Sequence, residues 1–497
     1  MLSPCPAHSK ESTAVRRYAA AGELLNNDGS TLSMVDEVRD SIAAIATPPG
    51  AGALAIVRVS GTDAIGIGDR VFRGAVPLDS AAGYTVHHGS IVGPGEERFD
   101  EVLVTVFRSP RSYTGEDMIE ISCHGGSYVT REIMRLVMEA GARPAQPGEF
   151  TRRAFLNGRI DLSQAEAVAD LIASRSRRGH RVSLEQLAGR LGGAVRSLRA
   201  EMMDLCALLE LELDFSEEGL DLITAQDVER RITAIRTRCG ALLASYAHGR
   251  IYRDGVRVVL AGEPNAGKSS VFNALLRQDR AIVTPVPGTT RDSLEESIVI
   301  EGILFLLTDT AGLRETVDQV EQIGVERSRS AASGADILVH VMDASVSPDV
   351  TEHLKRMSVH SDEQHFIPVL NKCDLLPAWP GPEVASMRGE TSGIVSPISA
   401  RTGQGLDALR AQLARVATGD GALGSEEICI TSERHRDALT KAHASLERAL
   451  AGLKSGATEE YLAFDIREAA SALAEITGEV SSEEVLNHIF ERFCIGK

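Results

Sequence analysis

The sequence predicts a multidomain protein in which α/β domains are combined with an all-α helical bundle. Its 497 residues exceed what one hydrophobic core usually serves, so about three domains are expected. A glycine-rich loop stands between an apolar strand pattern and a helix pattern near residues 256–276, which is typical of a phosphate-binding α/β domain. Two separate tracts carry apolar residues at alternating spacings of three and four, which is typical of packed helices.

The composition is that of a soluble globular protein from a reducing compartment. Hydrophobic residues make up 43% and charged residues 25% of the chain, and no apolar run has membrane-spanning length. A net charge of -18 means that any surface for nucleic acid must be local. The seven cysteines form no C-x-x-C pair, which argues against structural zinc. We therefore expect a cytoplasmic protein that does not bind membranes.

The first part of the chain is expected to contain a loose extension followed by an α/β domain. Residues 1–38 lack sustained periodicity and are predicted to be poorly ordered. Residues 39–155 alternate strand and helix patterns. The predicted strands are 42–46, 54–59, 102–107 and 118–122, and the predicted helices are 63–72 and 128–140. The glycine-rich turns between them suit either chain reversal or ligand binding.

Two helical tracts, residues 156–252 and 419–497, are expected to form one bundle. Their apolar rows are Val195, Leu198, Met202, Leu205 and Leu209, then Leu462, Ile466, Ala469, Leu473 and Ile476. Neither tract should be stable alone, so residues 253–418 would form a nucleotide domain inserted between them. Ser481 and Glu484 are predicted to cap a last helix.

An arginine-rich segment lies in the first helical tract. Between Ser174 and Ala200 there are seven arginines and one glutamate. Such a segment can be a solvated helix face, or it can contact an RNA backbone. The sequence leaves both interpretations open.

The segment Gly262–Ser270 is predicted to bind phosphates. Its glycines let backbone amides surround a phosphate chain, Lys268 adds a positive charge, and the Ser269 hydroxyl can ligate Mg²⁺. The expected nucleotide contacts in this loop are Asn265, Ala266, Gly267, Lys268, Ser269 and Ser270.

Two further segments are expected near the terminal phosphate. A hairpin over 297–308 ends in Asp309, Thr310, Ala311 and Gly312, where a carboxylate can bind Mg²⁺ through water and a glycine amide can approach the phosphate. Upstream lies a loop in which a threonine can complete the Mg²⁺ shell. Its expected contacts are Thr284, Pro285, Val286, Pro287, Gly288, Thr289 and Thr290.

Two loops that follow predicted strands are expected to recognise guanine. Asn371, Lys372 and Asp374 follow the strand 366–370, and the Asp374 carboxylate can accept two hydrogen bonds that adenine cannot donate. Ser399, Ala400 and Arg401 follow the strand 395–398 and are expected to close over the base. These elements in this order predict GTP rather than ATP.

The position after Gly312 is Leu313, where many GTPases have a glutamine that orients the attacking water. Another group must therefore position this water. Asn265 could hold a monovalent cation that stabilises charge between the terminal phosphates. It could equally be a turn residue that tolerates a left-handed backbone.

The chain resembles the MnmE (TrmE) family of tRNA modification GTPases from about residue 41 to its end. The specific stretches are 46–50, 113–117, 148–158 and 493–497, none of which a generic GTPase has. The resemblance implies a tetrahydrofolate-binding dimerisation domain at 39–155, a TrmE-type, Ras-like G domain at 253–418 and a helical domain in two parts. It also implies a potassium-dependent GTP hydrolase that works as a homodimer.

The resemblance further implies a heterotetramer with the FAD-dependent protein MnmG (GidA). Together they would add a carboxymethylaminomethyl or aminomethyl group to the wobble uridine of certain tRNAs. The one-carbon donor would be 5-formyl- or 5,10-methylene-tetrahydrofolate. The nucleotide motifs alone equally allow an alternative, an RNA-binding switch GTPase of ribosome assembly without modification chemistry.

Residue roles also follow from the resemblance. K⁺ falls to Asn265 with backbone oxygens of Thr284, Val286 and Thr289, and Mg²⁺ falls to Ser269 and Thr290. Catalytic roles fall to Asn265, Lys268 and Glu321, of which Glu321 would orient the water that Leu313 cannot.

The folate contacts implied by the resemblance are Arg58, Glu120, Arg159 and Lys497. A carboxylate such as Glu120 suits the donor pair of a pterin, and basic groups suit the glutamyl tail. Arg58 and Glu120 could equally form an ordinary salt bridge. The family commonly has lysine where this chain has Arg159. Cys494 is expected to be a buried thiol near this site without a chemical role.

Overall fold

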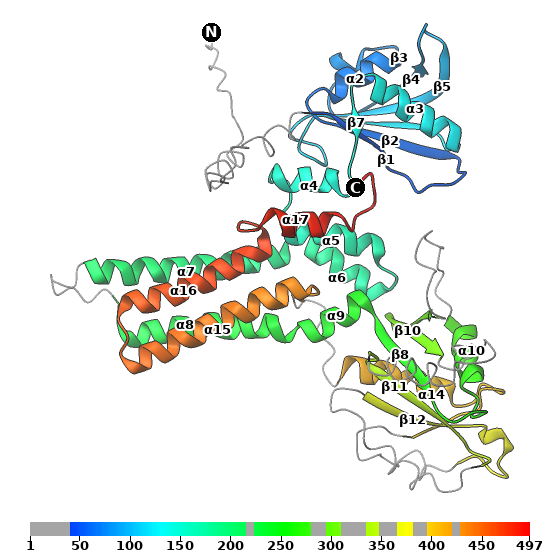
Figure 1. Ribbon diagram of the computed structural model, residues 1–497, viewed down its shortest axis with the longest axis vertical. Coiled ribbons are helices and arrows are strands. Elements are labelled where there is room, and N and C mark those ends of the chain that lie inside the picture. The colour runs from blue at the N-terminus through cyan, green and yellow to red at the C-terminus, as the bar shows by residue number, and fades with distance from the viewer. Residues whose placement is uncertain are drawn as a thin grey trace, which may run out of the picture. The chain divides into compact units, whose positions relative to one another are not determined.

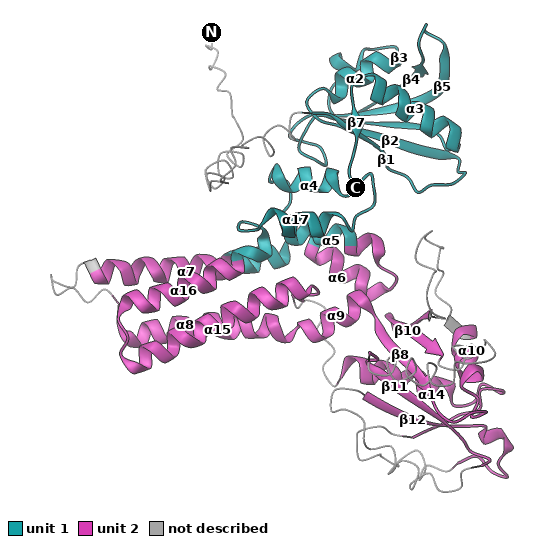
Figure 2. Ribbon diagram, viewed as in Figure 1, with its two compact units in different colours: residues 1–169, 187–196, 474–497 teal, residues 170–186, 197–473 magenta. Residues whose placement is uncertain are grey.

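The computed structural model describes residues 40–214, 223–279, 295–309, 334–346, 365–380, 395–419 and 428–497. The chain forms two compact units, residues 1–169, 187–196 and 474–497, and residues 170–186 and 197–473 (Figures 1 and 2). The predicted extension 1–38 lies outside the described residues, and the domain boundaries expected from the sequence stay predictions. In the described ranges, no helix has the length and apolar character needed to span a membrane.

Unit 1 is built on a seven-stranded sheet with the order β3-β4-β5-β6-β2-β1-β7. Its strands are β1 (Ile42–Ile45), β2 (Leu54–Ser60), β3 (Phe72–Gly74), β4 (Thr85–Val92), β5 (Arg98–Phe107), β6 (Met118–His124) and β7 (Arg143–Pro144). The four predicted strands are confirmed, although β5 begins at Arg98. The other three were not predicted, because β4 has histidines and a glycine in place of an apolar run and the remaining two are only two or three residues long.

Helices α2 (Ala64–Val71) and α3 (Ser127–Glu139) cover one face of this sheet, with the 3-10 turn η1 (Leu78–Ser80) after β3. Ile67 and Ile133 of the helices are fully buried in one cluster with Val57, Val104 and Ile121 of the strands. Both helices are confirmed near their expected bounds. Each apolar stripe thus meets the sheet face that alternates with the solvent side.

The opposite sheet face is covered at one end by α4 (Glu149–Leu156). Phe150 of this helix is fully buried with Ile42, Ala44 and Ala145, and Tyr113 packs against them. The rest of this face carries exposed side chains on β4 and β5, including Val86 and Leu103. The sheet is therefore only half covered within the chain.

Helices α5 (Leu162–Ala173) and α17 (Glu483–Phe490) meet in unit 1. Leu162, Leu486 and Phe490 share one buried cluster. The predicted cap of α17 is wrong by one residue, because the side chain of Ser482 accepts from the Val485 amide and the hydroxyl of Ser481 is buried instead. Either serine stands near the helix start, and only the backbone turn selects between them.

Unit 2 contains long helices on both sides of the nucleotide domain in the sequence. They are α6 (Arg177–Leu187), α7 (Arg190–Asp214), α8 (Ala225–Ala244), α9 (Tyr246–Asp254), α15 (Glu433–Ser455) and α16 (Glu459–Thr477). Helix α15 packs along α8, and the thiol of Cys206 on α7 is 3.5 Å from the carbonyl of Ala463 on α16. Both predicted apolar rows are buried, so the bundle prediction is confirmed (Figure 1).

The arginine-rich segment is partly engaged within the protein. The Arg178 guanidinium lies 5.7 Å from the ring centroid of Tyr252, and Arg181 is 3.4 Å from Glu185. Arg196 pairs with Asp161 at 2.8 Å. These three side chains support the structural interpretation of the segment.

The nucleotide domain is a six-stranded sheet with the order β13-β12-β11-β8-β10-β9. Its elements are β8 (Val256–Ala261), α10 (Lys268–Asp279), β9 (Glu295–Ile300), β10 (Ile303–Asp309), β11 (Ile337–Asp343), β12 (His365–Asn371), η4 (Cys373–Leu375), β13 (Ser396–Pro397) and α14 (Leu406–Thr418). Only β9 is antiparallel to its neighbour. The predicted strand, phosphate loop, helix and hairpin are confirmed. In a parallel sheet, the carboxyl ends of the strands meet at one edge, where ligands bind.

Candidate functional site

The phosphate loop leaves the carboxyl end of β8 and enters α10. At Gly262 (φ 140°) a Cβ atom would lie 2.1 Å from the carbonyl oxygen of Val341 on β11, so only glycine fits where the loop passes that strand. The Lys268 ammonium donates to the carbonyls of Gly262 and Glu263 at 3.0 and 2.9 Å. Ser269 and Ser270 are exposed on the first turn of α10, where a helix N-terminus favours an anion. The loop has the geometry of a phosphate site.

Asn371 connects the phosphate loop to both base-recognition loops. It is 1% exposed, donates to the Ala266 carbonyl at 3.0 Å and accepts from the Ala400 amide at 3.1 Å. At Gly267 (φ 92°) a Cβ atom would lie 2.3 Å from the Asn371 side-chain nitrogen. Because its amide group is used within the protein, Asn371 holds the loops in position rather than lying open to a ligand.

The carboxylate of Asp374 lies exposed in η4 at the same sheet edge. The buried hydroxyl of Ser399 donates to one of its oxygens at 2.7 Å. The amide of Cys373 donates to the Ile398 carbonyl at 3.2 Å, which joins the two loops. Arg401 is exposed beside them. An oriented carboxylate at this place can accept the paired donors of guanine.

Lys372 has a left-handed backbone (φ 65°), and its ammonium lies 2.6 Å from a carboxylate oxygen of Asp343. Asp343 was not among the residues predicted from the sequence. It belongs to no contiguous motif, and it meets Lys372 only because Asp343 and Asn371 are in register on the paired strands β11 and β12.

Asp309 ends β10, in register with Leu260 at the end of β8. Its side chain is buried, and it lies at the edge from which the phosphate loop emerges. Carboxylate, hydroxyl and phosphate oxygens are the ligands Mg²⁺ prefers, so Asp309 and Ser269 fit that ion in chemistry. No group of three or more His, Cys, Asp or Glu residues gathers as a metal site in the described part of the chain.

Asn265 is exposed and has a left-handed backbone (φ 62°). This conformation is the one expected of a tolerant turn residue, and it also leaves the side chain open to solvent. Its predicted part in a K⁺ site depends on residues outside the described ranges. Those residues, together with the predicted catalytic glutamate and the loop after β10, are Thr284, Pro285, Val286, Pro287, Gly288, Thr289, Thr290, Thr310, Ala311, Gly312, Leu313 and Glu321.

In unit 1 the predicted folate residues Arg58 and Glu120 face each other on the half-covered side of the sheet. The Arg58 guanidinium donates to one Glu120 oxygen at 2.9 and 2.7 Å. It also donates to the Gly496 carbonyl at 3.1 Å, and it lies 5.5 and 5.6 Å from the ring centroids of Tyr113 and Phe150. The salt bridge considered at the sequence level is therefore formed, within an aromatic setting.

The other two predicted folate residues differ in their surroundings. Lys497 is half-buried, and burial together with the charge of Arg58 lowers the pKa of its ammonium below the ordinary value. Arg159 is exposed and donates to the Ser112 carbonyl at 3.3 Å. The structure thus brings Arg58, Glu120 and the C-terminal residues together.

The expectation of a buried Cys494 is wrong, because this thiol is exposed. Its neighbour Phe493 occupies the apolar cluster, with its ring centroid 5.5 Å from that of Phe490. Successive side chains in this turn point to different sides, so only one of the two can enter the cluster.

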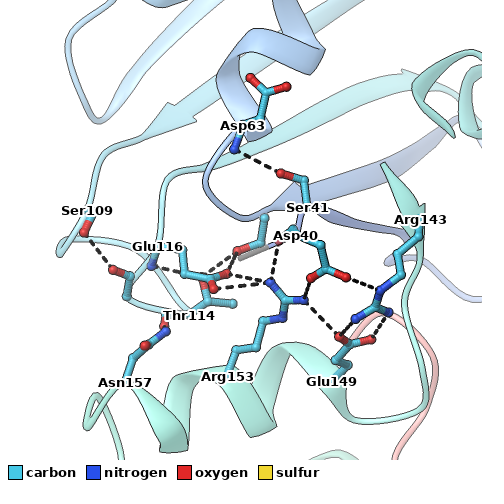
Figure 3. Close-up of polar contacts among 12 residues, drawn as sticks. Asp40, Ser41, Asp63, Ser109, Thr114, Glu116, Arg143, Glu149, Arg153 and Asn157 are labelled. Atoms are coloured by element: carbon cyan, nitrogen blue, oxygen red, sulfur yellow. Dashed lines mark hydrogen bonds and ion pairs between the residues drawn. The ribbon is translucent and has the colours of Figure 1, made fainter. Parts of the chain in front are cut away.

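A buried charge network lies beside this region (Figure 3). Arg153, whose side chain is 3% exposed, contacts Asp40 at 2.5 Å, Glu149 at 3.1 Å and Glu116 at 3.3 Å. Arg143 also binds Glu149, at 2.6 Å. These residues were not predicted individually, although three of them lie in the stretches 113–117 and 148–158 that carry the family resemblance.

The two buried carboxylates of this network have opposite pKa shifts. Burial raises the pKa of Glu116 above its ordinary value, and the charge of Arg153 only partly offsets this. Burial also opposes ionisation of Glu149, but the bonds from Arg143 and the Gln146 amide, with the charge of Arg153, hold its pKa below the ordinary value. Glu149 therefore stabilises the network as an anion.

A phosphate loop between β8 and α10, with Asp309 and Asp374 at the same sheet edge, defines a P-loop protein that binds guanine nucleotides. The family model described as "GTP-binding protein TrmE N-terminus" matches residues 41–159, and the model described as "MnmE helical domain" matches residues 162–494.

Curated relatives match nearly the whole chain. The tRNA modification GTPase MnmE of Chlorobium phaeobacteroides is 44% identical over 466 residues, which is 92% of this chain and 97% of that protein. Those of Symbiobacterium thermophilum and Roseiflexus sp. are also 44% identical, over 92% of this chain and 99% of each protein. The chain belongs to the MnmE family of tRNA modification GTPases. Membership makes it a GTP-hydrolysing enzyme, as the sequence motifs predict.

Proposed function

We propose that this chain is a potassium-dependent GTPase that, with a FAD-dependent MnmG partner, adds a carboxymethylaminomethyl or aminomethyl group to the wobble uridine of certain tRNAs. The observation that carries the proposal is family membership over 92% of the chain, combined with a guanine site whose loops are tied together by Asn371. The one-carbon donor would be a tetrahydrofolate derivative.

The nucleotide domain supports the hydrolytic part of this proposal. Lys268 would bind the terminal phosphates, and Asp374 would select guanine. Mg²⁺ held through Ser269, Thr290 and Asp309 would neutralise phosphate charge. K⁺ at Asn265 would supply a positive charge in the place that an arginine finger takes in other GTPases.

Water activation is proposed for Glu321. Leu313 cannot accept a proton or a hydrogen bond from water, so the side chain that normally follows Gly312 is missing from the mechanism. A carboxylate that reaches the terminal phosphate when GTP is bound could orient the water and receive its proton.

The folate part of the proposal is supported by one row of side chains across the unit 1 sheet. The register places Val86, Thr105, Glu120 and Arg58 on neighbouring strands of one face. Glu120 could accept from the pterin donor pair, the Tyr113 and Phe150 rings provide apolar contacts, and Lys497 and Arg159 could bind the glutamyl tail.

The same sheet face supports a homodimer. Val86 is 59% exposed and Leu103 is 47% exposed on this face, and they continue the row in which Arg58 and Glu120 stand. A second copy laid on this surface would bury both apolar side chains, which would contribute to dimer stability. The folate site would then lie at the edge of the dimer interface.

The remaining partners follow from the family. The relatives are named tRNA modification GTPases, so we propose tRNA as the macromolecular substrate and the cytoplasm as the compartment. A ribosome-assembly switch without modification chemistry is disfavoured, because the relatives and the family models extend over the folate and helical parts of the chain.

Nucleoside mass spectrometry of tRNA from cells that lack this protein tests the proposal. We expect the carboxymethylaminomethyl and aminomethyl uridines at the wobble position to disappear and to return with the wild-type chain. An Asp374→Asn chain should restore them poorly at normal GTP levels. Unchanged wobble uridines in the deletion strain would reject the modification chemistry.

A further inference from the structure

Lys372 stands at the edge of the sheet from which the proposed guanine contacts extend. It precedes η4, the turn that carries Asp374, and its backbone is left-handed (φ 65°). Only 31% of its side chain is exposed. A lysine side chain has four rotatable bonds and loses about 2 kcal/mol of rotamer entropy when it is fixed, so a contact that fixes it before the nucleotide arrives affects binding.

Asp343 provides that contact. It ends β11, where it is in register with Asn371 of β12, and one of its oxygens lies 2.6 Å from the Lys372 ammonium. The carboxylate is 15% exposed, so the pair is partly shielded from water. Charge-assisted hydrogen bonds of this length are among the stronger polar contacts in proteins.

The second oxygen of Asp343 is held separately. The amide and the hydroxyl of Ser345 donate to it at 2.9 and 2.7 Å. The turn itself is tied to β12, because the Ala344 amide donates to the Asn371 carbonyl at 2.8 Å. The carboxylate is thus fixed from one side and offered to Lys372 from the other.

The ionised state of Asp343 agrees with this arrangement. Burial works against the charge, but the bonds from Lys372 and Ser345 outweigh it and keep the pKa below the ordinary value. The carboxylate is therefore negative at neutral pH.

We propose that Asp343 is a positioning residue for guanine nucleotide binding, which orients Lys372 before the nucleotide arrives. This inference rests on the proposed nucleotide site. Asp343 acts through Lys372 and does not touch the reacting phosphate, so its loss weakens binding and leaves the chemical step unchanged.

The test measures binding of a fluorescent GDP analogue, mant-GDP, to the full-length chain and its variants. For Asp343→Ala we expect a Kd about tenfold higher than for the wild type, since one well-oriented ion contact is worth about 1.4 kcal/mol here. For Asp343→Asn, which keeps the shape, we expect a smaller increase. In GTP hydrolysis, KM should rise while kcat at saturation stays unchanged.

A double-mutant cycle separates positioning from a general structural effect. In a Lys372→Ala background, Asp343→Ala should change the Kd by less than twofold, because the group it orients is absent. Asp336→Asn is the matched control at the other end of β11. Asp336 pairs with Arg250 and accepts from the Arg257 amide, so its loss should leave the Kd unchanged.

Three results decide between the outcomes. An unaltered Kd in Asp343→Ala, or the same loss with and without Lys372, overturns the inference. Thermal unfolding without nucleotide identifies a misfolded variant, in which case Asp343→Asn takes the place of the alanine variant. If the wild-type chain binds no mant-GDP, the proposed nucleotide site itself fails.

Discussion

Arg153 of α4 lies 3.1 Å from Glu149 and 3.3 Å from Glu116, although its side chain is almost fully buried. A guanidinium in such a place must be neutralised, because an uncompensated buried charge costs several kcal/mol. Asp40 and Arg143 complete the network (Figure 3). The pairs tie the start of α4 to the segment before β1 and to the loop before β6.

Replacing Glu149 by glutamine should destabilise unit 1. Two arginines lose their shared partner, so we expect the free energy of unfolding to fall by about 2–4 kcal/mol at neutral pH. Hydrogen exchange of the α4 amides, followed by mass spectrometry, measures this effect within the unit. Glu139→Gln, which removes an exposed ion pair with Arg135, should change the exchange little. Equal protection in both variants would show that the network is not stabilising.

The same network predicts a pH dependence. The pKa of Glu149 lies below its ordinary value of 4.5, so its stabilising contribution is present above about pH 4.5 and is lost as the pH falls through the lower folded value. Glu116 has the opposite sign, because burial raises its pKa and its protonation favours the folded state. In Glu149→Gln, the loss of α4 protection below pH 4.5 should therefore be smaller than in the wild type.

Asp374→Asn should change base preference. An amide offers a donor where the carboxylate accepts, so we expect roughly 1 to 3 kcal/mol less GTP binding and a preference for xanthosine triphosphate. Competition against mant-GDP measures both affinities. Ser399→Ala, which removes the bond that orients the carboxylate, should weaken GTP binding without changing the preferred base. Unchanged selectivity in Asp374→Asn would reject the assignment of the base.

GTP hydrolysis should depend on the alkali cation. We expect rates in K⁺ to exceed those in Na⁺, and Asn265→Ala to remove that difference, because the side chain would ligate the cation. Steady-state hydrolysis at constant ionic strength tests this. Asn273→Ala, on the exposed side of α10, is the control and should keep the K⁺ response. Equal wild-type rates in both cations would exclude the cation role.

Glu321→Ala should retain nucleotide affinity and lose most turnover. Removal of a group that orients and deprotonates water typically costs on the order of 10² in rate. Single-turnover hydrolysis separates this loss from binding. The neighbouring Glu326→Ala serves as the control. If Glu321→Ala turns over at the wild-type rate, another group activates the water.

Glu120→Gln should weaken binding of 5-formyltetrahydrofolate by about tenfold, since the carboxylate would lose a charge-assisted contact to the pterin donors. Isothermal titration calorimetry on the full-length chain measures it. Glu101→Gln on the exposed end of β5 is the control, because its carboxylate is 70% exposed and pairs only with His88 among the described residues. A loss of stability without a loss of folate affinity would leave Arg58 and Glu120 as a structural ion pair.

Local patterns were sufficient for the elements that carry their own signal. The strand, phosphate loop and first turn of the nucleotide domain follow from hydrophobic spacing and two glycines, and the long helices follow from their apolar rows. Strands β3, β4 and β7 escaped prediction because they are short or polar and depend on pairing with neighbours. The cap at Ser482 and the exposure of Cys494 also depended on the local turn of the backbone.

The sequence by itself determined the guanine-binding motifs, the family and the helical bundle that surrounds the nucleotide domain in the chain, since each of these is encoded in contiguous residues or in periodic spacing. Only the tertiary structure decided that Asn371 is occupied in tying loops together, that Asp343 holds Lys372, and that Arg153 neutralises three carboxylates. Those contacts join residues from separate strands and helices. Strand register and burial, which no local pattern specifies, select the partner of each side chain.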